Sequence, residues 1–191
     1  MRYLKLGNIP LLIIFLLTVP TTISAQTNGD ALSANTLKSI KKEAKKLVKG
    51  GWDSFPGDPS IEEQLIDVYI KRAEKYLIDE TKPRWVFGDA TATVNQLNIA
   101  KDWSMENAKS DLMAKMGTLI EKEIQTNYSD NKSIKIESVK QDVSSEIKRK
   151  LEYTEHVLRI FRQINGTYEV TTKIIYKYDL IQYAINKQFD N

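Results

Sequence analysis

His156 is the single histidine in a chain of 191 residues that has no cysteine. Thiol nucleophiles, cysteine-bound zinc or iron–sulfur clusters, disulfides and any site built from two histidines are therefore excluded. A histidine base needs a nucleophile or an orienting acid within hydrogen-bond reach. In a strand Glu155 points to the opposite face, and Glu152 lies about 13 Å along the strand. We therefore interpret His156 as an ordinary residue of a sheet.

Paired carboxylates are the remaining route to an enzyme, because a glycosidase needs only two acids about 5 to 10 Å apart. Asp89, near the end of a predicted strand, and Glu62 or Glu63 in a predicted helix are the candidates. The chain has 25 acidic residues, so such a pair also arises by chance. A carboxylate-dependent hydrolase is accordingly the third-ranked hypothesis.

Cofactor and metal sites have no sequence support. No phosphate-binding loop or dinucleotide-binding motif occurs, and the acids Glu121 and Glu123 are interpreted as exposed helix residues. We therefore expect no cofactor and no metal.

Three tryptophans are the candidates for an aromatic groove that binds a glycan or another small molecule. They are Trp52, Trp85 and Trp103. Packing in a core is the alternative for all three, because large aromatic side chains are usually buried.

Residues 1–25 have the pattern of an export signal. Arg2 and Lys5 precede an apolar run at 9–19, and small residues lead to Ala25, after which we expect cleavage. The run is shorter than the roughly 20 residues of a membrane-spanning helix. Export to the periplasm or association with the outer membrane is the expected localisation.

Charge gives little support to a nucleic-acid partner. The whole chain has 28 basic and 25 acidic residues, and removal of residues 1–25 takes away two basic residues and no acid. A nearly neutral mature chain has no long-range field that attracts polyphosphate. The exception is the segment Lys38–Lys49, where six lysines accompany one glutamate. It is either a solvated helix face or a contact with anionic lipid or glycan.

Apolar periodicity predicts an α+β chain. The expected helices cover residues 37–49, 58–79, 94–127, 136–151 and 179–189, and the first expected strand covers 84–93. Asp58 and Pro59 are expected to begin the second helix, with the aspartate as its cap, after a loop at 52–58. The long helix has two apolar patches, so we expect it to lie on the sheet and to carry the N-terminal helices on its back.

A hairpin at 153–178 is the most specific structural signal. Asn165 and Gly166 tolerate the positive φ of a type I′ turn, so Ile164 should face Thr167. The further pairs expected from this register are Gln163 with Tyr168, Arg162 with Glu169, Phe161 with Val170, Leu158 with Lys173, Val157 with Ile174, and Tyr153 with Tyr178. One face of the hairpin should meet the helices, and the other should be wetter.

An apolar island lies on the wetter face. Leu158, Ile160 and Ile175, with His156 beside them, are either covered by another segment or available to a partner. This island is the candidate partner patch.

Small residues suggest a family. Gly88, Ala90 and Ala92 in the strand are followed by Ala108, Asp111 and Leu112 in the long helix and by a late pair of strands. This arrangement, over about residues 84–178, resembles the small envelope lipoprotein domain related to the N-terminal domain of the flagellar outer-membrane T-ring protein. The resemblance implies a helix-on-sheet domain used for assembly or surface association, without catalytic residues. Those lipoproteins are tethered through a cysteine, whereas this chain has Gln26 after the signal, so lipidation is not expected.

The sequence thus predicts an α+β fold: a small antiparallel sheet, formed by strand 84–93 and hairpin 153–178, packed against a long helix. The expected organisation is a signal at 1–25, a helical segment at 26–83 and an α+β domain at 84–191, with 26–191 as one folding unit. The expected function is a non-enzymatic envelope protein that contacts another envelope protein or itself. Binding of a glycan or small molecule is the second hypothesis.

Overall fold

The computed structural model describes residues 32–76, 79–127, 136–151, 154 and 156–189. These residues belong to one compact unit. The N-terminal segment with the predicted export signal lies outside the described residues.

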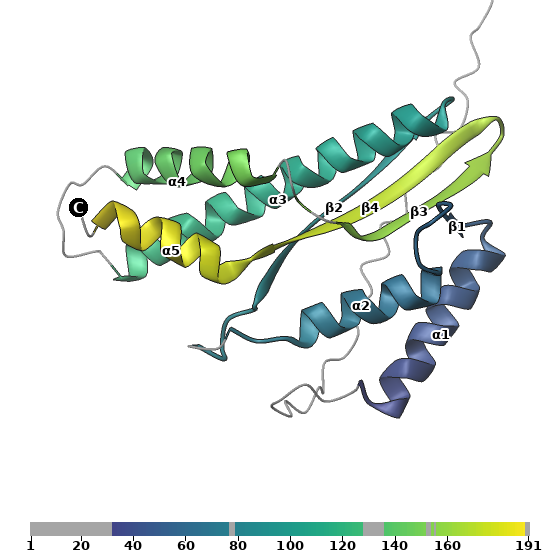
Figure 1. Cartoon of the computed structure of the whole chain (residues 1–191), viewed down its shortest axis with the longest axis horizontal. Coiled ribbons are helices and arrows are strands. Elements are labelled where there is room, and N and C mark those ends of the chain that lie inside the picture. The colour runs from purple at the N-terminus through teal and green to yellow at the C-terminus, as the bar shows by residue number, and fades with distance from the viewer. Residues whose placement is uncertain (1–31, 77–78, 128–135, 152–153, 155, 190–191) are drawn as a thin grey trace, which may run out of the picture. The chain divides into compact units, whose positions relative to one another are not determined.

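Five helices and four strands make up this unit (Figure 1). In chain order they are α1 (Ala34–Lys49), β1 (Asp53–Ser54), α2 (Ile61–Ala73), β2 (Trp85–Val94), α3 (Leu97–Asn127), α4 (Ile136–Lys150), β3 (His156–Ile164), β4 (Thr167–Lys177) and α5 (Tyr178–Phe189). The predicted α+β class is confirmed: the sheet is antiparallel, with strand order β1-β3-β4-β2, and the long helix α3 packs against it.

Both faces of the sheet are covered by helices. On one face α3 packs on β2 and β4, and α4 and α5 pack beside it (Figure 1). On the other face α1 and α2 bury Ile40, Leu65 and Val68 against β3. The expectation that the N-terminal helices lie on the back of α3 is wrong. An amphipathic helix must bury its apolar stripe, and here the second face of the sheet provides the surface.

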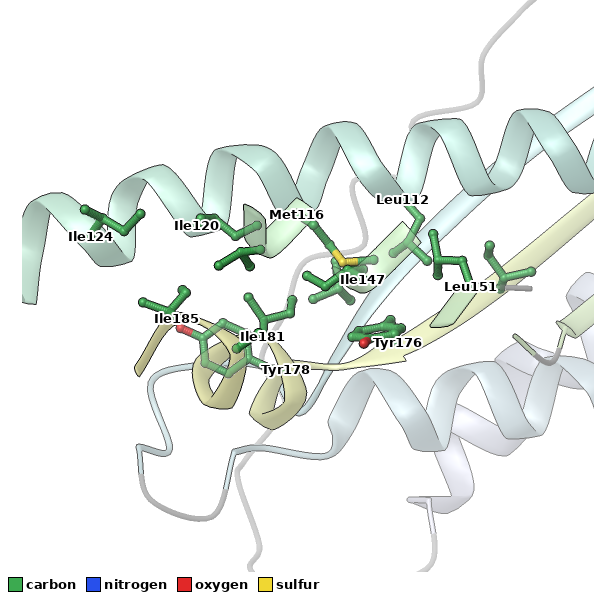
Figure 2. Packing of buried hydrophobic residues seen from close by; sticks show 14 of the residues in the cluster. Leu112, Met116, Ile120, Ile124, Ile147, Leu151, Tyr176, Tyr178, Ile181 and Ile185 are labelled. Carbon is green, nitrogen blue, oxygen red and sulfur yellow. The ribbon is translucent and has the colours of Figure 1, made fainter. Parts of the chain in front are cut away.

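The larger core lies between α3, α4, α5 and the sheet (Figure 2). Leu112, Met116 and Ile120 form one fully buried stripe of α3, which faces Tyr176 of β4 and Ile181 of α5. The stripe repeats every four residues, as a helix buried along one side requires.

Gly88 is the point of closest approach between β2 and α3. A Cβ atom at this position would lie 2.3 Å from the Ala108 carbonyl oxygen and 2.5 Å from the Leu112 Cβ. Both are far inside van der Waals contact, so only glycine lets the helix lie this close to the strand. The buried residues Ala92, Ala100 and Ala108 likewise have small side chains.

The hairpin has the predicted turn, with positive φ at Asn165 and Gly166. The predicted register is confirmed from Ile164 opposite Thr167 to Leu158 opposite Lys173. A bulge at Val157 then shifts it, so that His156, not Val157, faces Ile174. Tyr178, which was predicted to pair with Tyr153, is the first residue of α5, and Tyr153 lies outside the described residues.

The segment before α2 differs from its prediction. Asp53 and Ser54, expected in a loop, form β1 and pair with Phe161 and Ile160 of β3. The N-cap of α2 is Ser60, which forms a reciprocal capping box with Glu63. Asp58, which was expected as the cap, does not cap the helix, because its carboxylate pairs with the charged guanidinium of Arg159 in β3.

The second helix also ends earlier than predicted, at Ala73. Glu74 is extended, Lys75 bridges to Pro83, and the Tyr76 amide donates to the Lys82 carbonyl. These bonds satisfy backbone groups that a continued helix would have used.

A buried ionic network lies at the end of the larger core. Glu123 of α3 is 5% exposed and accepts hydrogen bonds from the Tyr178 hydroxyl and from Lys82 Nζ, which lies 2.8 and 2.9 Å from its two oxygens. Gln182 Nε2 donates to the Tyr178 hydroxyl at 2.9 Å. The interpretation of Glu123 as an exposed helix acid is wrong, because Lys82 reaches across from the loop before β2.

This network shifts the pKa of its members. Burial opposes ionisation of Glu123, but the bonds from Lys82, Tyr178 and Gln182 outweigh it and hold the Glu123 pKa below its ordinary value. Burial and the bond to Glu123 raise the pKa of Tyr178 to about 12. The bond to Glu123 also raises the Lys82 pKa.

We predict that Gly88→Ala lowers the free energy of unfolding by about 3 kcal/mol, because the added methyl group has no space beneath α3. Gly117→Ala is the matched control within α3, where a Cβ would meet only Lys140 Cε at 3.9 Å. It should raise stability by about 0.5–1 kcal/mol through helix propensity. Urea denaturation measures both changes, and equal effects of the two variants would contradict the close approach.

We predict that Glu123→Gln lowers stability by about 2 kcal/mol at pH 7, because two charge-assisted hydrogen bonds are weakened. The folded-state pKa of Glu123 lies below its ordinary value of 4.5, so this contribution is present above about pH 4.5 and is lost as the pH falls through the lowered pKa. The difference between wild type and variant should therefore shrink in acid.

Glu121→Gln is the control, since Glu121 lies two residues away on α3, has a side chain that is 45% exposed, and pairs with Lys140 at 3.0 Å. An exposed pair contributes at most about 1 kcal/mol. Urea midpoints at neutral and acidic pH compare the two variants, and indistinguishable curves would rule out a special role for the buried acid.

Candidate functional site

The predicted partner patch is part of a core. Leu158 is 3% exposed and Ile160 is 2% exposed, and Ile175 packs against the same cluster. Leu158 and Ile160 belong to this cluster together with residues of α1 and α2. Ile175 and His156 are half-buried and line the cavity described below. Of the two alternatives, covering by another segment is realised at Leu158 and Ile160, so these two residues offer no available apolar surface.

The three candidate tryptophans do not form one groove. Trp52 packs on Arg162, whose cross-strand partner is Glu169, whereas Trp85 pairs with Lys177 at the other end of β4. Eight residues of a strand separate these positions, about 26 Å. Trp103 is 56% exposed on α3, which covers the opposite face of the sheet from α1 and α2. Of the three, Trp85 lines the cavity described next.

The Trp85 pocket arises because the sheet narrows. The first pair of β3 joins His156 to Ile174, but β4 continues to Lys177 and stays paired with β2 as far as Trp85. The two helical layers are therefore separated by only two strands here. The resulting cavity of about 520 Å³ lies among α2, the start of β2, the end of α4, and the ends of β3 and β4.

Trp85 is held in place by one acid and surrounded by cations. Its Nε1 donates to Glu74 at 2.8 Å. Lys71 Nζ lies 4.8 Å from the ring centre, Lys177 Nζ lies 5.7 Å away and the Arg84 guanidinium carbon lies 5.8 Å away. Such distances allow cation–π attraction, which fixes the orientation of the ring at the cavity wall.

Tyr176 lines the same pocket and has a buried hydroxyl without a partner. Its side chain is 7% exposed and lines the cavity, and its Oη is the one buried side-chain polar atom without a hydrogen-bond partner among the described residues. Burial raises the Tyr176 pKa, so the hydroxyl keeps its proton and is a donor. A buried unpaired hydroxyl costs roughly 1–3 kcal/mol, and an acceptor that reached it would remove this cost.

The charges that line the pocket are mainly positive. Lys71, Lys150 and Lys177 face one acid, Asp67. Lys150 pairs with Glu146 at 3.0 Å and Lys71 with Glu74 at 3.7 Å. With these partners counted, the three lysines stand against three acids, Asp67, Glu74 and Glu146. Among the described residues Lys177 forms no ion pair, so an anionic group would be attracted to Lys177 in particular.

His156 lines the pocket but is already engaged. Its Nε2 lies 3.5 Å from Asp58, which also forms a two-point ion pair with Arg159 at 2.9 and 3.0 Å. Burial and the nearby Arg159 charge lower the His156 pKa, against the opposing effect of Asp58. Sequence reasoning sought an acid next to His156 in the same strand and missed Asp58, which comes from another element.

The carboxylates of the hydrolase hypothesis each have other partners. Asp89 lies 3.5 Å from both Lys173 and Lys115, which overcome its partial burial and keep its pKa below the usual value. Glu63 bonds Ser60 in the capping box, and Glu62 lies 3.9 Å from Lys41. The bonds from Ser60 also lower the Glu63 pKa, so the pKa values of Asp89 and Glu63 are both shifted away from that of a general acid.

Metal and membrane features can be stated for the described residues alone. Within them no three acidic or histidine side chains are placed to share a metal ion. No helix in this part of the chain combines the length and apolar character needed to span a bilayer.

Comparison of the chain with protein-family models, with curated proteins and with solved structures finds no match. The resemblance to the T-ring-related envelope domain stays a prediction.

We predict that Tyr176→Phe raises the free energy of unfolding of the ligand-free protein by about 1 kcal/mol, because the variant removes a buried hydroxyl that has no partner. Tyr178→Phe is the control, since it removes a hydroxyl bonded to Glu123 and Gln182 and should destabilise by about 1–2 kcal/mol. Thermal and urea unfolding compare them. A loss of stability in Tyr176→Phe would show that its hydroxyl is satisfied in solution.

Proposed function

We propose that this protein is a non-enzymatic binding protein that holds a small anionic organic molecule in the Trp85 pocket. The observation that carries the proposal is a cavity lined by the Trp85 indole and by Lys177, with the unpaired hydroxyl of the lining residue Tyr176 buried in the protein beside it. A cavity of about 520 Å³ has the size of ordinary small-molecule sites, about 300–1,000 Å³.

The chemistry of the wall indicates the parts of the ligand. The exposed part of the Trp85 ring offers a flat surface to a sugar ring or to an aromatic or apolar body. Lys177 offers charge to a carboxylate or phosphate, and the Tyr176 hydroxyl is a donor for any acceptor that reaches it from the cavity. A ligand with a flat body and one acidic group uses all three features.

This proposal places ligand binding ahead of protein contact. Two of the apolar residues expected to contact a partner, Leu158 and Ile160, are buried, which leaves the hypothesis of an envelope assembly protein without a contact surface at those two residues. The setting remains the one inferred from residues 1–25: an exported protein of the cell envelope. A mature chain that begins at Gln26, read by N-terminal sequencing of the exported fraction, tests that setting.

We predict a saturable change in Trp85 fluorescence when the protein is titrated with an acidic ligand. A double variant, Trp52→Phe with Trp103→Phe, leaves Trp85 as the reporter. The probes are a glucuronic-acid disaccharide and phenylacetate, with lactose as a neutral disaccharide. Lys177→Gln and Tyr176→Phe should each weaken binding about ten-fold, the effect of one good polar contact.

The matched control is the protein in which Trp103 alone remains. Trp103 is exposed on a different face, so its emission should not respond. A flat Trp85 signal with both acidic probes, or a stronger response to lactose than to either acid, would contradict the proposal. A fold measurement by circular dichroism on each variant excludes unfolding as the cause.

A further inference from the structure

The exposed face of α1 carries a concentrated positive charge. Its six lysines are Lys38, Lys41, Lys42, Lys45, Lys46 and Lys49, and all six are exposed. At 100° per residue they fall within an arc of about 140°, centred about 150° from the buried Ile40 and Ala44. Lys38, Lys42, Lys45 and Lys49 lie within about 60° and form a row about 16 Å long.

Little negative charge balances this row. The single acid of the helix, Glu43, accepts a hydrogen bond from the Tyr69 hydroxyl of α2 at 3.0 Å, so it is turned toward the neighbouring helix. Lys41 lies 3.9 Å from Glu62, a long and exposed contact. The lysine row is also separate from the Trp85 pocket, which no residue of α1 lines.

We propose that this face of α1 docks the protein on an anionic lipid surface. The four lysines of the row lie on one side of the helix, so their ammonium groups can all contact a flat charged surface at once. The apolar stripe of α1 is used in the fold against α2 and β3, so the contact is electrostatic adsorption and not insertion.

The composition of the face favours lipid over nucleic acid. Proteins that bind nucleic acids use arginine for two-point phosphate contacts and aromatic rings for base stacking. The helix α1 has neither an arginine nor an aromatic residue. Lysine is a strongly hydrated point charge, suited to a diffuse field of lipid phosphates.

Vesicle co-sedimentation of the full 191-residue chain tests the proposal. Vesicles of equimolar phosphatidylglycerol and phosphatidylcholine are compared with vesicles of phosphatidylcholine alone, which measure any contribution of the apolar N-terminal segment. The variant Lys38→Gln, Lys42→Gln, Lys45→Gln should lose on the order of 100-fold of the preference for anionic vesicles, about five-fold per lysine. Raising the salt to about 1 M should remove the preference in the wild type, since screening then acts within about 3 Å.

The matched control removes the same charge elsewhere. Lys75→Gln, Lys122→Gln, Lys148→Gln changes three exposed lysines on other elements and should keep the preference. Glutamine supports a helix almost as well as lysine, so the variants should fold. Equal binding by both triple variants would overturn the proposal. Tighter binding to heparin or duplex DNA than to anionic vesicles would overturn lipid as the partner.

Discussion

The close contact of α3 with the sheet at Gly88 is the constraint on which the larger half of the structure depends. The close approach of the α3 backbone to β2 at Gly88 sets the distance between the helix and the sheet. It also sets the direction of the helix axis for all 31 residues of α3. The C-terminal part of α3 then extends beyond the sheet and packs against α4 and α5. In that part Glu123 binds Lys82 and the Tyr178 hydroxyl. A larger side chain at Gly88 would increase the distance between α3 and β2 and would therefore disturb the packing of the whole core.

The pocket and the core are products of the same mismatch in strand length. The strand β4 is longer than β3 and enters α5 directly, so the two helical layers face each other beyond the end of β3 with one strand pair between them. Side chains of Trp85, Tyr176 and three lysines line the space. A pocket produced by sheet geometry needs no dedicated loop, which explains why it has no sequence motif.

Local chemistry in the sequence predicted the elements well, and tertiary contacts account for the errors. The Asn165 turn and the hairpin register depend on neighbouring residues and could be predicted. The bulge at Val157 accompanies contacts of Asp58 and Gln64 with Arg159, about 100 residues apart, which no periodicity shows. The apolar stripes of α1 and α2 predicted that one side of each helix is buried. They did not predict that the sheet, and not α3, covers that side. In the site, Trp85 could be singled out as an aromatic residue, whereas the missing partner of Tyr176 is visible only in three dimensions.

The hydrogen bond from the Asp89 amide to the Asp111 carboxylate, at 2.9 Å, also bears on aggregation. A ten-residue outer strand such as β2 exposes backbone groups to which a second molecule can add a strand. Here a side chain of α3 occupies one of those donors near the middle of β2, and Lys115 and Asp89 place charges beside it. The same helix that builds the core thus interrupts edge-to-edge pairing, and it protects the molecule from polymerising through its own sheet.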